Sequence, residues 1–478
     1  MDKITETRSI SPSLRWLTRG AARHQMAAEL SEAARLALPM VLAQLGQIAM
    51  MTTDLAFIGR ISAEAIAAAA LASRVYLAGI TFGIGLFAAV TSLAAEAFGA
   101  HNLAAVRRSV GMGLWAALLL SLPITALSLR GEQILLAVGQ APDAARLAQQ
   151  YLLGLAWGVA PALCFGVIRS FMGAVHRPEP IFWITLGAIP FNALLVYLLI
   201  YGKLGLPRLE LFGAGLATTL VNFATLFAGL WFATVPRPFR YYHVLAGLWC
   251  FDCRLMQQLI VVGTQISITF LMDGAIWSAA AFLMGIISTS ALAAHQIAYQ
   301  LASILYLIFF GIGVPANVRV GHAVGRNDGP GIKRAGLAAF VLGIVIAAIV
   351  SLVVIAARFE IAEFFLADAA DATISLATNL LLVGASCFIT TAMYSIALGS
   401  LRGLKDTRVP LLFAAVGQWL IGLSLSYALG LKIGLGPIGI WIGLSIGTTV
   451  YAALLVVRFR LLASRLAIQN RCPATQMR

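Results

Sequence analysis

Charged residues are scarce in this chain of 478 residues. Only 11% of the residues are charged, whereas 60% are hydrophobic, and the mean hydropathy is +0.91. A water-soluble fold of that composition would expose far more apolar surface than soluble proteins tolerate. The shortage of charge therefore excludes an ordinary soluble protein. It predicts an integral membrane protein whose main surroundings are the lipid bilayer.

Disulfide frameworks, nucleotide motifs and catalytic clusters are also lacking. The five cysteines are scattered, and Cys164 and Cys387 fall inside apolar stretches, so no disulfide framework is implied. A single Cys-x-x-Cys, formed by Cys250 and Cys253, has no second pair and is a weak signal for a metal or redox site. No Ser-His-Asp constellation, metal-ligand cluster or P-loop is evident. These absences argue against an enzyme, a metal site, a nucleotide partner and an ATP-driven pump.

What the sequence does contain is a second copy of itself, displaced by 226 positions. The pairs that keep this register are Gly59 and Gly285, Ile61 and Ile287, Ser62 and Ser288, Ala65 and Ala291, Ala72 and Ala298, Gly85 and Gly311, and Gly99 and Gly325. The doublet Arg107-Arg108 also recurs as Lys333-Arg334. Chance matching of small residues is the alternative, but it does not explain the charged doublets. Such duplications in apolar chains are typical of membrane transporters, whose substrate site lies between or within two related bundles.

Apolar stretches long enough to cross the hydrocarbon core, roughly 20 residues each, occur six times in each copy. They cover residues 36–58, 71–97, 109–130, 149–173, 181–201, 212–235, 257–284, 293–320, 335–357, 375–400, 410–430 and 436–457. The sequence therefore predicts an all-α integral membrane protein with twelve transmembrane helices. These helices would form two six-helix lobes. The predicted segments are an N-terminal tail (1–35), an N-lobe (36–235), a linker (236–256), a C-lobe (257–457) and a C-terminal tail (458–478).

Arginine and lysine predict the orientation in the membrane. If both termini lie on one side, that side carries about three quarters of the 33 basic residues, as expected for cytoplasmic loops. Since each copy has an even number of spans, the copies are related by a pseudo-twofold axis along the membrane normal. The net charge of +14 follows from this asymmetry and needs no nucleic-acid partner. The first thirty or so residues lack an apolar core, so we expect no cleavable signal peptide.

Acids at membrane depth are the best candidates for function, because an ionised Asp at a helix centre costs about 2.5–3.5 kcal/mol. The acids that qualify are Asp54, Glu96 and Asp273. Asp54 lies late in the first span, two turns beyond Gln47 and on the same side of the helix. A buried carboxylate can hold either a proton or a cationic ligand, and this competition is a ready mechanism for antiport. A structural partnership, for example with Arg74, is the alternative.

Asp273 lies inside the seventh span, with Thr269 one turn before it and Trp277 one turn after it. An acid, a hydroxyl and an indole on one stripe can form a pocket wall for a lipophilic cation, which gains from charge pairing and from the aromatic face. The repeat places no acid opposite Asp273 or Asp54, so the two halves have specialised. A buried structural hydrogen bond is the alternative for this acid too.

Three other polar side chains within the spans are weighed in the same way. Glu96, near the cytoplasmic end of the second span, is expected to pair with Arg107 and Arg108. His295 is expected to be a packing histidine, with a proton relay as the alternative. Asn192 is a candidate for the site because it shares the first lobe with Asp54.

Five short motifs mark the spans and their ends. They are Leu38-Pro39 with Asp54 later in the same span, Tyr201-Gly202-Lys203-Leu204-Gly205, Ala293-Ala294-His295-Gln296-Ile297-Ala298, Arg319-Val320-Gly321-His322, and Gly399-Ser400-Leu401-Arg402-Gly403 followed by Lys405-Asp406. Through these motifs the chain resembles the multidrug and toxic compound extrusion family, in its bacterial NorM-like branch, over essentially all twelve spans. Each motif alone is weak, and together they are fairly specific.

The resemblance implies two lobes that form a V and export organic cations in exchange for protons or sodium. It implies that Asp54 is the first-span acid involved in coupling. Asp273 stands where the NorM-like pattern has Glu, and Thr391 stands where it has Asp. One negative charge of the second lobe is therefore absent. This departure disfavours a tight sodium site and favours protonation of Asp54, with Asp273 serving the substrate or a weakened ion site.

The mechanism we expect is alternating access. Protonation or sodium binding at Asp54 repacks the first span, which flexes at Pro39, and releases a bound cation. The residues expected in the cavity are Gln47, Asn192, Thr269, Trp277 and Thr391. We expect a monomer in the bacterial inner membrane, with both termini cytoplasmic, that exports cationic drugs or dyes. The alternative is a flippase for a lipid-linked precursor, in the same broader superfamily, although a diphosphate favours a cationic cavity.

Overall fold

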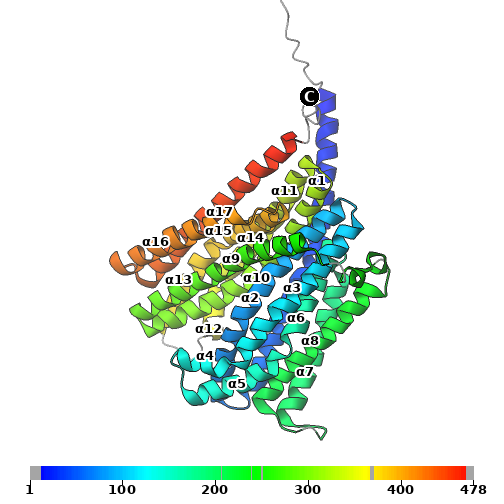
Figure 1. Ribbon diagram of the computed structural model, residues 1–478. Helices are drawn as coiled ribbons and strands as arrows, with labels where there is room; N and C mark the ends of the chain where they lie inside the picture. The colour runs from blue at the N-terminus through cyan, green and yellow to red at the C-terminus, as the bar shows by residue number, and fades with distance from the viewer. Residues whose placement is uncertain (1–11, 206, 238, 249–250, 366–370, 470–478) are drawn as a thin grey trace, which may run out of the picture.

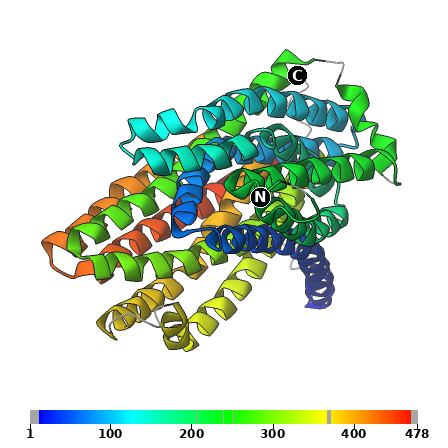
Figure 2. The same cartoon turned by 90° about the horizontal axis from the view of Figure 1, so that it is seen from below.

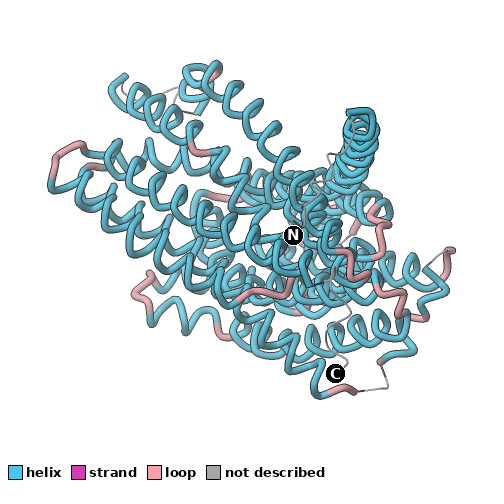
Figure 3. Tube along the Cα trace, turned by 90° about the horizontal axis from the view of Figure 1, so that it is seen from above, coloured by secondary structure: helices cyan, strands magenta, loops and turns pink. Residues whose placement is uncertain are grey.

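Every regular element that the computed structural model describes is a helix. The structure describes residues 12–205, 207–237, 239–248, 251–365 and 371–469. The first half contains α1 (Pro12–Gly59), α2 (Ala63–Gly99), α3 (Leu103–Leu129), α4 (Gly131–Ala137), α5 (Pro142–Ala156), α6 (Val159–Ala174), α7 (Glu179–Tyr201), α8 (Glu210–Thr234), η1 (Phe239–Tyr242) and η2 (Val244–Gly247). The second half contains α9 (Cys253–Ile287), α10 (Thr289–Gly325), α11 (Gly329–Ala356), α12 (Arg358–Phe365), α13 (Asp371–Ser386), α14 (Phe388–Gly403), α15 (Arg408–Ala414), η3 (Ala415–Leu423), α16 (Ser424–Tyr427), η4 (Ala428–Lys432) and α17 (Gly436–Gln469). Figure 3 shows these helices joined by short loops.

Ten helical segments of the described chain are long and apolar enough to cross a membrane. Two further pairs of helices meet the same criteria together but are bent at a short break. The pair α5 and α6 is bent by 50°, and the pair α13 and α14 by 45°. The predicted twelve spans are obtained if each bent pair crosses once, and the bent pairs then form the fourth span of each half.

The bend in the first half frees a backbone carbonyl group, that of Gly154, which a neighbouring helix satisfies. Between α5 and α6 the carbonyl oxygens of Gly154 and Gly158 accept hydrogen bonds from the side chains of Thr219 (2.6 Å) and Asn222 (3.3 Å), both on α8. A helix can break inside a membrane protein only where neighbouring side chains replace the lost backbone bonds. The polar side chains of α8 therefore stabilise the bend in the fourth span.

Helices α1–α8 form a first bundle and α9–α17 form a second bundle. Figures 1 and 2 show the two bundles side by side, the first coloured blue to green and the second green to red. They meet along four long helices, because α1 packs against α10 while α2 packs against both α9 and α10. The beginning of α1 and the end of α17 lie together at the top of Figure 1, and we call this end of the molecule the terminus side.

At the terminus side, α2 and α10 cross through two glycines. A Cβ on Gly99 would lie 2.4 Å from the carbonyl oxygen of His322, and one on Gly325 would lie 2.1 Å from that of Glu96. Only a residue without Cβ allows backbones to approach so closely. Gly99 and Gly325 are 226 positions apart, and so are Glu96 and His322. The internal repeat is therefore present in the structure as two equivalent contacts around one pseudo-twofold axis.

Candidate functional site

Asp54 is buried between three helices of the first bundle. It is 9% exposed on α1, and Nδ2 of Asn192 on α7 donates a hydrogen bond to its Oδ1. Thr218 on α8 also lies beside the carboxylate. Asn192 is fully buried, and its Oδ1 has no partner in the part of the chain that the structure describes. Asp54 forms no ion pair with Arg74 there, so the structure brings together two predicted residues, Asp54 and Asn192.

The other two candidates on α1 do not join this pair. Gln47 is exposed, and seven residues of helix separate it from Asp54 by roughly 10 Å along the axis. Packing against the neighbouring helices covers the position of Asp54 and leaves that of Gln47 open. Pro39 lies inside α1, which continues through it without a break. Its role as a hinge therefore stays a prediction.

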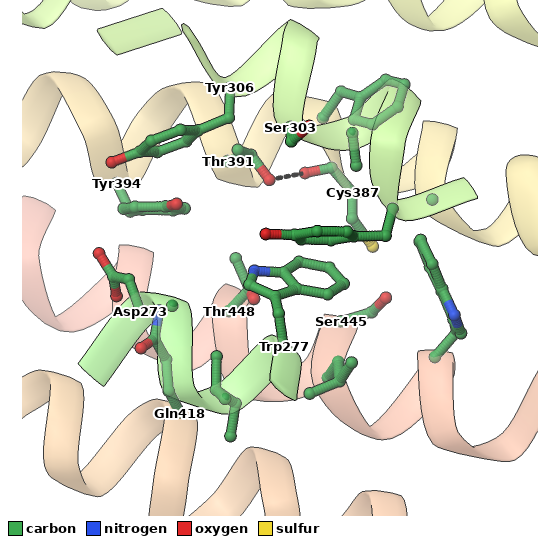
Figure 4. Close-up of a pocket in the computed structure, with 18 of the residues that line it drawn as sticks. Asp273, Trp277, Ser303, Tyr306, Cys387, Thr391, Tyr394, Gln418, Ser445 and Thr448 are labelled. Carbon is green, nitrogen blue, oxygen red and sulfur yellow. Dashed lines mark hydrogen bonds between the residues drawn. The ribbon is translucent and has the colours of Figure 1, made fainter. Parts of the chain in front are cut away.

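A cavity of about 220 Å³ lies inside the second bundle (Figure 4). Asp273 and Trp277 line it from α9, and Thr391 lines it from α14. Figure 4 shows Asp273, Gln418 and Tyr394 along one side of this cavity. Neither carboxylate oxygen of Asp273 has a hydrogen-bond partner among the described residues, nor has Oε1 of Gln418. The cavity thus contains a buried acid with unused capacity to accept hydrogen bonds or a cation.

The two threonines predicted for this region differ in position. The hydroxyl of Thr391 faces the cavity but donates to the carbonyl oxygen of Cys387 at 2.9 Å, as the dashed line in Figure 4 shows. Thr269 is 3% exposed, donates to the carbonyl oxygen of Gln265 in its own helix at 2.9 Å, and does not line the cavity. The expected stripe of acid, hydroxyl and indole is therefore reduced to Asp273 and Trp277, because packing covers Thr269 outside the cavity.

His295 packs beside the cavity as a neutral acceptor. It is 1% exposed, and Nε1 of Trp441 donates a hydrogen bond to its Nδ1 at 3.1 Å. Its ring also stacks with that of Tyr299 at 6.2 Å. These contacts confirm the prediction of a packing histidine, because Nδ1 accepts a hydrogen bond from an indole N–H group, which does not titrate.

Several residues around Asp273 are not predicted from the sequence. Arg402 is 7% exposed on α14, and its guanidinium carbon lies 5.0 Å from the centre of the Phe270 ring. Tyr394 packs against Tyr306 and Tyr451, with ring centres 6.1 Å and 5.5 Å apart. Arg402 lies two residues beyond the predicted span 375–400, in the motif Gly399-Ser400-Leu401-Arg402-Gly403, and that position beside an apolar span was its usable signal. The tyrosines had none, since aromatic residues are common throughout such spans.

Side chains from both bundles form ion pairs at the terminus side. Arg319 on α10 is 8% exposed and pairs with two acids of α1, Glu29 and Glu32, the second at 3.0 Å. Glu96 on α2 pairs with Lys405, which follows α14. The prediction that Glu96 forms an ion pair is confirmed, but the predicted partners were wrong. The reason is that the end of α2 packs on the second bundle, which brings Lys405 closer than Arg107 and Arg108.

Two histidines from different bundles also meet at the terminus side. The ring of His176, in the loop after α6, lies 4.4 Å from that of His322 on α10. Nε2 of His322 donates to the carbonyl oxygen of Ala174 at 2.7 Å. Burial lowers the pKa of His176 to about 4. The charged groups that act on His176 are Arg319 and Arg326, which favour its neutral form, and Glu32, which opposes them.

Comparison with known proteins covers most of the chain. The family model MatE matches residues 39–198 and 266–428. The chain is 53% identical to the "Probable multidrug resistance protein NorM" of Bradyrhizobium diazoefficiens, over 94% of this chain and 96% of that protein. It is 51% identical to the protein of the same name from Rhodopseudomonas palustris, over 90% and 91%. It superposes with a TM-score of 0.84 and 18% identity on a multidrug resistance MATE family transporter of the MOP superfamily in an outward-facing conformation, covering 92% of this chain and 96% of that one.

Proposed function

Because the chain belongs to the MatE family of multidrug and toxic compound extrusion transporters, we propose that it exports lipophilic organic cations in exchange for protons. One observation carries this proposal: each bundle buries one carboxylate, Asp54 or Asp273, that forms no ion pair among the described residues. Two separate acids allow a proton and a cationic substrate to bind in different bundles. The names of the relatives support a multidrug substrate range.

The pair formed by Asp54 and Asn192 suits a proton as the coupling ion. When Asp54 is ionised, the amide nitrogen of Asn192 donates to its Oδ1. When Asp54 is protonated, the new O–H group on Oδ2 can donate to Oδ1 of Asn192, which has no other partner. The pair therefore satisfies both protonation states. A sodium ion gains nothing from the N–H group that faces the carboxylate, so sodium is the less favoured coupling ion.

The cavity of the second bundle suits a lipophilic cation. It combines the buried carboxylate of Asp273 with aromatic faces, among them Trp277, Tyr299 and Trp441. A cation gains from the negative charge and from aromatic rings, and apolar groups on the ligand gain from the rest of the lining. Since Thr391 supplies a hydroxyl rather than a second acid, the cavity offers one negative charge.

Export requires the two bundles to separate and rejoin at alternate sides of the membrane. The ion pairs of Arg319 and Lys405 join the bundles at the terminus side. We place this side in the cytoplasm of a bacterial cell, because the basic residues concentrate there. The moving bodies would be the lobes 36–235 and 257–457, connected by the linker 236–256, and the functional unit a monomer.

A flippase for a lipid-linked diphosphate is the second candidate. Such a ligand needs cationic groups inside the cavity. The lining of the cavity includes Asp273 and, among the described residues, no lysine or arginine. This lining favours cation export over lipid flipping.

The test is proton release from acidified everted vesicles after addition of ethidium, with and without sodium. We expect release in the wild type, a loss of release in Asp54→Asn, and a weaker response in Asp273→Asn. Asp143→Asn is the matched control, because Asp143 is an exposed acid at the start of α5. If export requires sodium, sodium and not the proton is the coupling ion. If no cation causes a response, the flippase is favoured.

A further inference from the structure

Part of the cavity lining is an aromatic ring on which an arginine stacks. Phe270 lies one turn before Asp273 on α9 and lines the cavity, whereas Arg402 does not line it. The guanidinium of Arg402 stands over the Phe270 ring at 5.0 Å, on the last turn of α14. The ring therefore separates the positive charge of Arg402 from the space that a ligand would occupy.

Arg402 is the cation whose field reaches Asp273. The titratable groups that act on Asp273, or on which it acts, are Tyr306 of α10, Arg402 and Tyr394 of α14, and Tyr451 of α17. Only Arg402 in this set is positively charged at neutral pH. Gln418 of η3 is the other polar neighbour of the carboxylate, and it is neutral.

Neither charge is neutralised by direct contact. The carboxylate oxygens of Asp273 have no hydrogen-bond partner within the described ranges, and Arg402 forms no ion pair there. A buried charge without compensation is costly, but a nearby opposite charge lowers that cost through the low-dielectric interior. The two groups therefore compensate each other through the protein while the oxygens of Asp273 stay free for a ligand.

We propose that Arg402 is the resident countercharge of Asp273 and limits the cavity to one additional positive charge, so that it selects monovalent over divalent cations. This inference rests on the proposed function of the cavity. With Arg402 present, the empty site is close to neutral. A proton or a monovalent organic cation binds at Asp273 against the field of Arg402, and each excludes the other. A divalent cation meets the same field with twice the charge, so the penalty that Arg402 imposes on its binding is twice as large.

The experiment measures binding of tetraphenylphosphonium, a monovalent cation, and of methyl viologen, a divalent cation, to the full-length protein in nanodiscs between pH 5 and 9. The variants are Arg402→Gln, which removes the charge, and Arg402→Lys, which keeps it. Arg169→Gln is the matched control, because it removes an arginine of α6 in the fourth span of the other bundle. Wild type and variants are first compared by thermal unfolding.

We expect Arg402→Gln to bind tetraphenylphosphonium roughly tenfold more tightly at pH 9 and methyl viologen by a larger factor still, since the removed repulsion doubles with the charge. Protons should displace either cation at a higher pH than in the wild type, because the proton gains from the same change. Arg402→Lys and Arg169→Gln should keep the wild-type constants and the wild-type pH midpoint. The shift of the pH midpoint in Arg402→Gln should vanish when Asp273→Asn is also present, because Asp273 is the group that the competing proton occupies.

Unchanged binding constants in Arg402→Gln overturn the inference, and so does a shift of the pH midpoint that persists together with Asp273→Asn, because that shift would come from another titrating group. If Arg402→Gln alone does not fold, the double variant with Asp273→Asn should recover the wild-type unfolding temperature, and failure to recover it overturns the inference. If the wild type itself shows no binding that depends on Asp273, the proposed role of the cavity is wrong, and the inference falls with it.

Discussion

Replacing Gly325 by alanine is expected to weaken the contact between the two bundles at the terminus side. The added Cβ would lie 2.1 Å from the carbonyl oxygen of Glu96 and 2.7 Å from the backbone nitrogen of Ala100. Both atoms belong to the backbone of α2 and its end, so they cannot rotate away, and α2 and α10 must move apart. Overpacking of this kind costs about 1–3 kcal/mol. That cost lowers the population of the joined arrangement about 5- to 150-fold relative to the separated one.

The assay measures how fast a maleimide labels a cysteine placed between the bundles. Ser92 on α2 is 1% exposed and donates a hydrogen bond to Asn317 on α10 at 3.0 Å, so Ser92→Cys is protected while the bundles are joined. In a background with the native cysteines replaced by serine, Gly325→Ala should raise the labelling rate by the same 5- to 150-fold. Gly187→Ala is the matched control, because nothing lies within 4 Å of its added Cβ.

An unchanged labelling rate in Gly325→Ala would refute the close approach of α2 and α10, and with it the equivalence of the two glycine contacts. A rise in Gly187→Ala of the same size would mean that the assay reports general loss of stability rather than separation of the bundles. Thermal unfolding of both variants, measured in the same detergent, distinguishes these two outcomes.

Three other changes test separate parts of the structure. Thr219→Val removes the 2.6 Å hydrogen bond to the Gly154 carbonyl at the bend of the fourth span, and the free energy of unfolding in detergent should fall by about 1 kcal/mol. His176→Gln should reduce the pH dependence of the contact between the bundles. The pKa of His176 is about 4 in the joined arrangement against an ordinary 6.5, so that arrangement is most stable above pH 6.5 and weakens as the pH falls toward 4. The labelling rate measures this change, and the buried His322 beside it remains in the variant. Asn192→Ala should reduce cation-driven proton release about tenfold or more, and adding it to Asp54→Asn should cause no further loss, because the two side chains act as a pair.

The class of the protein, its repeat and its two buried acids could be predicted from the sequence. Apolar stretches of membrane length are recognised from local composition. The register between Gly99 and Gly325 is recognised by direct comparison of the two halves. An acid inside an apolar stretch, such as Asp54 or Asp273, is conspicuous because burial of charge is unfavourable wherever the helix packs. These properties do not require knowledge of which helices are neighbours.

The partners of those residues could not be predicted in the same way. Glu96 was expected to pair with arginines close in sequence, but it binds Lys405, more than 300 positions away. Thr269 has the correct helical spacing from Asp273, yet it is buried and does not line the cavity. Helical periodicity gives the direction of a side chain, whereas the packing of neighbouring helices decides what that side chain meets.

The sequence by itself determined that the chain lies in a membrane, that it is duplicated, and that Asp54 and Asp273 are the acids to be explained. The tertiary structure alone decided that Asn192 faces Asp54, that the fourth span of each half is bent, and that Arg402 stands behind Phe270 near Asp273. The physical reason is the range of the interactions. Partition into the bilayer acts on each stretch of chain separately, while hydrogen bonds and charge compensation inside a bundle depend on contacts between segments far apart in the sequence.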